Sequence, residues 1–222
     1  MALMNGITAL KTAAKYILAP LLYRFPPSEL APEHLYLYLH QLILRQQVPG
    51  DIVEVGCHLA GTAIIAAKML WRLEIKKRYR CYDTFGGFVG THFQRDVIEG
   101  TPPYHHSAFS ANSKHLVERI LRKHSAQGIE LIGGDIATLP DQQLPEAIAV
   151  CLIDVDLSEP TYLALKRLYP RLSTGGVILV DDCPVEGSWK AWLGYRRFAA
   201  EIGLPERYEY GMGIVEKVPA AT

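Results

Sequence analysis

The chain has 222 residues, and its 23 Lys and Arg balance its 23 Asp and Glu, so the formal net charge is zero. With 49% hydrophobic and 21% charged residues, it has the composition of an ordinary globular domain, with or without a short appendage. The neutral charge argues against a nucleic-acid partner. Its four cysteines form no CxxC pair, which indicates reduced thiols and a cytoplasmic protein rather than disulfides or zinc.

Residues 1–48 are expected to form a helical segment ahead of the main domain. The first 25 residues contain basic side chains but no acid, and Pro20 interrupts their apolar stretch. This pattern argues against a signal peptide and against stable membrane insertion. A second helix is predicted from Glu33 to Gln47. We interpret the segment as a lid, as a packing element or as an interface with a second subunit. The last of these interpretations would make the protein a homo-oligomer.

Residues 49–222 alternate short apolar runs with helical patterns, which is typical of βα units around a parallel sheet. Strands are predicted at 51–56, 79–84, 129–132, 148–153 and 177–180, and helices at 61–73, 159–171 and 189–202. Two further runs, 208–210 and 213–216, indicate a closing antiparallel hairpin, because a tight turn cannot join parallel neighbours. We therefore predict a Rossmann-like α/β domain with about seven mostly parallel strands and helices on both faces.

Residues 86–109 lack this regularity and hold many Gly, Pro and His residues. An irregular stretch of this length inside a compact domain is either disordered or functional. We predict that it forms a lid over the ligands, with Phe93 and Tyr104 as aromatic walls. The histidines of this loop and of the first strand–helix turn have roles that the sequence does not decide: His58, His92, His105 and His106.

The first predicted strands end in residues suited to a nucleoside cofactor, because ligands of an open parallel sheet bind beyond the carboxyl ends of its strands. Gly56 allows a sharp turn off the first strand and Gly61 allows entry into the next helix. The GxGxxG fingerprint of dinucleotide binding is absent, which argues against a nicotinamide cofactor. A cofactor without phosphate is compatible with this turn, and a purely structural turn is the alternative. Asp83 lies where an acid accepts hydrogen bonds from a ribose, and Asp135 lies where a carboxylate approaches adenine.

The next two strands end in acidic pairs. Asp154 and Asp156 follow one apolar run, and Asp181 and Asp182 follow the next. Carboxylates brought together this way repel one another, and a divalent cation that prefers oxygen ligands, such as Mg²⁺, relieves the repulsion. A metal beside a carboxylate base can activate a hydroxyl group. The alternative is that Asp156 caps a helix and that Asp181 or Asp182 makes a surface contact.

Taken together, these residues resemble the macrocin O-methyltransferase family, whose members methylate sugar hydroxyls of natural products. The matching segments lie within residues 51–183 and are Glu54-Val55-Gly56 with Gly61, Tyr82-Asp83-Thr84-Phe85 with Gly87-Phe88, Asp154-Val155-Asp156 with Thr161, and Tyr169-Pro170-Arg171-Leu172 through Gly175-Gly176 to Asp181-Asp182. The chain departs from the family at Cys57-His58-Leu59-Ala60, where a basic residue and an extra glycine are common, at Gly86, where an acid is usual, and at Cys183, where an aromatic residue is expected.

The resemblance implies a class I fold that binds S-adenosylmethionine and Mg²⁺. The expected cofactor-binding residues are Glu54, Gly56, Cys57, Gly61, Asp83, Thr84, Phe85, Asp135 and Asp154. The expected metal ligands are Asp154, Asp181 and Asp182, and Asp154 is also the expected catalytic base.

We predict an S-adenosylmethionine-dependent O-methyltransferase that acts on a hydroxyl of a natural-product sugar or a similar small molecule, with Mg²⁺-assisted deprotonation. A phenol or a carboxyl group is the alternative acceptor. A nicotinamide-dependent oxidoreductase and a non-catalytic binding module are alternatives of other classes, although the first would require a glycine turn and a Tyr–Lys pair that are absent. The acceptor and the need for the metal are not determined by the sequence.

Overall fold

Five apolar runs form the parallel part of the sheet in the computed structural model, which describes residues 2–183 and 187–217. They are β1 (Asp51–Val55), β2 (Tyr79–Asp83), β3 (Ile129–Gly133), β4 (Ile148–Ile153) and β5 (Leu172–Val180). The hairpin of β6 (Tyr208–Glu209) and β7 (Met212–Glu216) adds antiparallel strands. The seven-stranded order β3-β2-β1-β4-β5-β7-β6 confirms the predicted fold class.

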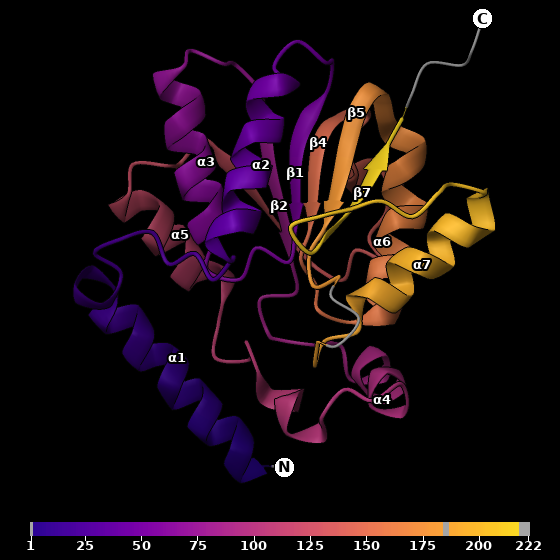
Figure 1. The fold of residues 1–222 in the computed structure, drawn as a ribbon. Coiled ribbons are helices and arrows are strands. Elements are labelled where there is room, and N and C mark those ends of the chain that lie inside the picture. Colours follow the sequence, from indigo (N-terminus) through magenta and orange to yellow (C-terminus); the bar gives the residue numbers. More distant parts are fainter. Residues whose placement is uncertain (1, 184–186, 218–222) are drawn as a thin grey trace, which may run out of the picture.

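Helices cover both faces of this sheet (Figure 1). Successive residues of a strand point to opposite faces, so Ile52 packs with α2 (Pro32–Leu44), α3 (Gly61–Arg72) and α5 (Lys114–Lys123). Val53 packs on the opposite face with α6 (Ser158–Leu168) and α7 (Ala191–Ile202). Helix α5 was not predicted from the sequence, although its buried residues Leu116, Val117, Ile120 and Leu121 have helical spacing.

Strand β5 begins five residues earlier than the sequence indicated. Leu172 pairs with Ile148 and Val177 with Val150, so the two strands are out of step between these pairs. The predicted turn at 174–176 is therefore a bulge inside β5, where Gly175 has a φ of +80°.

The predicted N-terminal segment forms two helices with different environments. Helix α1 (Ala2–Leu22) contacts the domain through α5 and extends away from the sheet (Figure 1). Helix α2 instead packs directly on the sheet and buries Leu37, Tyr38 and Leu42. Within residues 2–183 and 187–217, no helix is both long enough and apolar enough to span a bilayer.

The expectation of an irregular loop at 86–109 was wrong. This segment contains α4 (Gly90–Ile98) and a 3₁₀ helix, Pro103–Ser107. Asp96 of α4 is buried, and its Oδ1 accepts a hydrogen bond of 2.9 Å from the backbone N–H of Ser158. Ser158 is the first residue of α6 rather than its N-cap, because a side chain distant in the sequence satisfies the free N–H at the start of this helix.

Candidate active site

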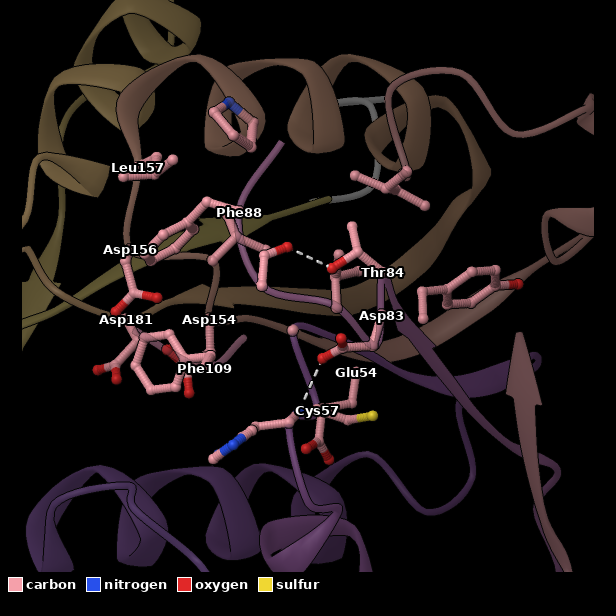
Figure 2. A pocket seen from close by; sticks show the side chains of 18 of the residues that line it. Glu54, Cys57, Asp83, Thr84, Phe88, Phe109, Asp154, Asp156, Leu157 and Asp181 are labelled. Atoms are coloured by element: carbon pink, nitrogen blue, oxygen red, sulfur yellow. Dashed lines mark hydrogen bonds between the residues drawn. The ribbon is translucent and has the colours of Figure 1, made fainter. Parts of the chain in front are cut away.

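Backbone hydrogen bonds continue past the strands and bring four chain segments together at the carboxyl edge of the sheet. Gly56 N–H donates to Tyr82, Asp154 N–H to Val55 and Asp181 N–H to Ile153, each at 2.8 Å. A cavity of about 360 Å³ lies at this edge (Figure 2). Its volume is in the range of small-molecule binding sites, and it lies where the sheet topology predicts a ligand.

Two glycines allow the close backbone approaches on which this cavity depends. Gly56 has a φ of +87°, and a Cβ atom there would lie 1.7 Å from the carbonyl oxygen of Asp154. A Cβ atom on Gly61 would lie 2.1 Å from the carbonyl carbon of Pro27. Any side chain at either position would therefore displace the backbone of a neighbouring segment.

Asp83 holds the two loops that border the cavity. Its Oδ2 accepts a hydrogen bond from His58 N–H and its Oδ1 accepts one from Phe85 N–H, both at 2.7 Å. Burial raises the pKa of Asp83, and these two hydrogen bonds oppose the rise. Each carboxylate oxygen can accept a second hydrogen bond, so Asp83 can also accept hydrogen bonds from a ligand in the cavity.

The other residues expected to bind a cofactor fall into two groups. Those that line the cavity together with Asp83 are Glu54, Gly56, Cys57, Gly61, Thr84, Asp135 and Asp154. Phe85 instead places its side chain in the hydrophobic core and contributes its backbone N–H to Asp83. Asp135 Oδ2 lies 3.0 Å from Nε2 of His92, which also lines the cavity.

The acidic side chains gather on another part of the cavity wall. Oxygen atoms of Asp154, Asp156 and Asp182 lie within 4.8 Å of one another. Figure 2 shows the carboxyl groups of Asp154, Asp156 and Asp181 together, apart from Asp83 and Glu54. Asp156 and Asp182 have φ values of 62° and 52°. Such left-handed conformations store strain that proteins tolerate at functional sites.

Mutual repulsion and burial act together on the protons of these carboxyl groups. Burial, followed by the charges of Asp181, Asp156 and Asp182, raises the pKa of Asp154 well above 3.8. Burial and the charge of Asp182 do the same for Asp156. Burial and the charge of Asp181 raise the pKa of Asp182 to about 6. The donor set consists only of carboxylate oxygens, so it fits a hard divalent cation, which would keep the group ionised.

Asp181 differs from the other three acids because a histidine side chain lies against it. Its Oδ1 lies 2.6 Å from Nδ1 of His34 on α2. This contact raises the pKa of His34 and opposes the effect of burial. The structure therefore brings Asp156 into the carboxylate cluster and gives Asp181, one of the expected ligands, an additional contact that the sequence did not reveal.

Aromatic side chains from residues 86–109 and from the chain just before α7 form another wall of the cavity. Phe88, Phe109 and Trp189 line the cavity, and the Phe88 ring centroid lies 5.6 Å from each of the other two. Phe93 stacks behind Phe88 and is buried, whereas Tyr104 is 78% exposed. The aromatic walls are thus not those predicted, since the spacing of aromatics along the chain does not show which of them face a cavity.

Of the unassigned histidines, His58 and His92 line the cavity. His105 packs at an angle against Trp189, and His106 packs edge-on against Phe93. Residues 27–30 form a strap that crosses the start of α3 and lines the cavity, and this position was not predicted from the sequence. Glu29 of this strap lies 3.2 Å from His58 Nδ1. The Pro26-Pro27 pair is the sequence signal for an extended strap at this position, but it does not show where the strap lies.

Comparisons with known proteins agree on one family. The macrocin-O-methyltransferase (TylF) family matches residues 35–205. The chain is 29% identical over 181 residues to 8-demethyl-8-(2,3-dimethoxy-alpha-L-rhamnosyl)-tetracenomycin-C 4'-O-methyltransferase of Streptomyces olivaceus, covering 72% of this chain and 62% of that protein. It is 27% identical over 161 residues to demethyldecarbamoylnovobiocin O-methyltransferase of Streptomyces niveus, covering 64% of this chain and 57% of that protein. The chain thus spans about three fifths of the length of these relatives.

The fold is also shared with a solved structure. The O-methyltransferase NovP superimposes with a TM-score of 0.68 at 22% sequence identity, covering 84% of this chain and 79% of that chain. At this level of identity the likeness concerns the fold, and any function has to be argued from the residues of the site.

Proposed function

This chain belongs to the macrocin-O-methyltransferase family, and from that premise we propose that it is an S-adenosylmethionine-dependent O-methyltransferase. The observation that carries the proposal is a single cavity with two different halves. One half holds the Gly56 turn and Asp83, and the other holds the carboxylates of Asp154, Asp156 and Asp182. The first half suits a nucleoside cofactor, and the second suits an acceptor whose proton must be removed.

The cofactor half is assigned to S-adenosylmethionine, which supplies a methyl group bonded to a positively charged sulfur. Asp83, fixed by two backbone N–H groups, accepts hydrogen bonds from the ribose hydroxyls. Asp135 would border the adenine, and Glu54 would face the amino-acid end. The tight turn at Gly56 leaves space for the cofactor without offering a phosphate cradle. Eight acidic side chains line the cavity, which supports a ligand with positive charge.

The acidic half is assigned to proton removal from the acceptor. Asp154, Asp156 and Asp182 would hold a divalent cation, with Asp181 beside them, and an all-oxygen donor set favours Mg²⁺. A bound Mg²⁺ supplies positive charge that lowers the pKa of a nearby hydroxyl group. Asp154 accepts the hydroxyl proton as the acceptor oxygen bonds to the methyl carbon. The carbon–sulfur bond breaks with its electron pair on sulfur, which leaves S-adenosylhomocysteine.

We infer that the acceptor is a small glycosylated natural product that is methylated on a sugar hydroxyl. Both curated relatives are named for natural-product acceptors, and one of these names includes a rhamnosyl group. The aromatic wall of Phe88, Phe109 and Trp189 supports this inference, because flat apolar surfaces pack against an aglycone or a sugar ring and exclude water from the reacting atoms. A phenol is the competing acceptor, since the same acidic cluster serves it.

The first test is calorimetric titration of S-adenosylhomocysteine into the purified protein, with Mg²⁺ and with EDTA. We expect micromolar binding that weakens at least tenfold in Asp83→Ala. Methylation assays with glycosylated and phenolic acceptors follow, with Asp154→Asn as the inactive control. A folded wild-type protein that binds no S-adenosylhomocysteine in either buffer would overturn the proposal.

A further inference from the structure

A chain of three buried hydroxyl and carboxyl groups runs from helix α2 to the wall of the cavity. The Tyr79 hydroxyl donates a hydrogen bond of 2.6 Å to Oε2 of Glu54. The hydroxyl oxygens of Tyr38 and Tyr79 lie 2.7 Å apart. Tyr79 has one hydroxyl hydrogen and directs it to Glu54, so Tyr38 donates the second bond. The three residues come from α2, β2 and β1, and Glu54 alone lines the cavity.

We propose that Tyr79 is a positioning residue, held in turn by Tyr38, that orients the Glu54 carboxylate toward the ammonium group of the cofactor's amino-acid end. This inference rests on the proposed function. It assigns a role in cofactor binding to two tyrosines that do not themselves touch the cavity.

Burial explains why such a support is needed. Glu54 is 2% exposed, Tyr79 3% and Tyr38 0%, and a buried carboxylate is stable only with hydrogen-bond partners or an opposite charge. Tyr79 satisfies Oε2 alone. Among the described residues, Oε1 has no hydrogen-bond partner, and the carboxyl group borders the cavity. An arriving cation would therefore meet a carboxyl group that is already fixed at one oxygen, and its positive charge would favour the ionised form of that group.

The charges around Glu54 favour a cationic ligand. Among the described residues that line the cavity there is no Lys or Arg, and histidine is the basic residue present. The acidic groups on the wall are Glu29, Glu54, Asp83, Asp135, Asp154, Asp156, Asp181 and Asp182. The protein thus supplies no ammonium or guanidinium partner for Glu54 from this wall. The amino-acid end of the cofactor carries such a charge, whereas its nucleoside end does not.

This difference within the cofactor gives the test. S-adenosylhomocysteine carries the ammonium group, and 5'-methylthioadenosine shares the nucleoside but lacks the amino-acid end. By calorimetry we expect Tyr79→Phe to weaken S-adenosylhomocysteine binding about tenfold, because the fixed hydrogen bond to the charged Glu54 is lost. Binding of 5'-methylthioadenosine should change less than about twofold. With S-adenosylmethionine as substrate, KM should rise while kcat is retained.

Tyr162→Phe is the matched control, because Tyr162 is also buried and its hydroxyl also donates to a glutamate, Glu201, on the far side of the sheet. It should leave the affinity for both ligands unchanged. Tyr38→Phe should also weaken S-adenosylhomocysteine binding more than 5'-methylthioadenosine binding, although less strongly than Tyr79→Phe does. It replaces Tyr79→Phe in the test if that variant does not fold.

Two outcomes in the tyrosine variants would overturn the inference. One is an equal loss of both ligands in the tyrosine variants, which indicates general damage to the fold, and the other is no loss of either. Equal affinity of the wild type for the two ligands would also overturn it, because Glu54 would then contribute nothing. Failure of the wild type to bind S-adenosylhomocysteine is a different result, and it would count against the proposed function itself.

Discussion

Replacing Glu54 with glutamine removes an ionisable group from the cavity wall while keeping its size and an oxygen that can accept the Tyr79 hydrogen bond. Burial raises the pKa of Glu54 from 4.5 to about 8, and Asp83 adds to the rise while the Tyr79 bond opposes it. Because each unit of difference between two pKa values corresponds to 1.36 kcal/mol, ionised Glu54 destabilises the ligand-free protein by up to about 5 kcal/mol.

The folded state binds the Glu54 proton more tightly than the unfolded state does, and this difference makes the stability of the protein depend on pH. The contribution of Glu54 to stability is fully present below pH 4.5, where the unfolded state is protonated as well. It is lost as the pH rises from 4.5 through 8. The Glu54→Gln variant does not ionise at this position, so its free energy of unfolding should increase relative to that of the wild type as the pH rises.

Urea denaturation of both proteins without ligand at pH 5, 7 and 9 measures this difference. We expect Glu54→Gln to match the wild type at pH 5, to exceed its free energy of unfolding at pH 9 by several kcal/mol, and to bind S-adenosylhomocysteine more weakly at pH 7. A difference between the two proteins that stays constant with pH would contradict this prediction, because it would mean that Glu54 titrates normally in the folded state.

Three further outcomes follow from the geometry. Mg²⁺ should raise the melting temperature of the wild type more at pH 8 than at pH 5, because the cation competes with protons on carboxyl groups such as Asp182, whose pKa is about 6. Differential scanning calorimetry measures this rise, and a Mg²⁺-induced rise of the same size in the Asp182→Asn variant would contradict the prediction. Asp96→Asn should lower the free energy of unfolding measured in urea by about 1–2 kcal/mol, because Asp96 accepts hydrogen bonds from Ser158 and Thr101. An unchanged free energy would show that the hydrogen bond from Asp96 to the start of α6 contributes nothing to stability. Gly56→Ala should lower the free energy of unfolding by about 3 kcal/mol or more, because the new Cβ would lie 1.7 Å from the Asp154 carbonyl oxygen. Thermal unfolding followed by circular dichroism would show the lower stability, and a variant as stable as the wild type would contradict the prediction.

The strands and the general position of the site follow from local sequence patterns. Runs such as 148–153 are apolar throughout because a central parallel strand is covered on both faces, and β4 indeed occupies these positions. Once the chain is read as βα units, Gly56, Asp83 and Asp154 must lie at the same edge of the sheet, because the carboxyl ends of parallel strands meet there. Their presence in one cavity could therefore be predicted without coordinates.

The partners of these residues could not be predicted in the same way. Tyr38 reaches Tyr79, His34 reaches Asp181, and Asp96 caps α6, in each case across a long stretch of chain. Such contacts depend on how the helices pack on the sheet, and the periodicity of the sequence does not predict them. The choice of Asp156 as the neighbour of Asp154 and Asp182 also depends on the φ of single residues at the strand ends.

Local sequence patterns were sufficient to predict the α/β sheet, the edge at which the cavity lies and the acidic character of that edge, because the alternation of polar and apolar residues and the chemistry of glycine and aspartate act locally. Only the folded molecule shows which aromatic side chains line the cavity, that residues 27–30 cross α3, and which buried hydroxyl groups are hydrogen-bonded next to Glu54. These features arise from packing between segments far apart in the chain, and their energy depends on distances that only the folded molecule sets.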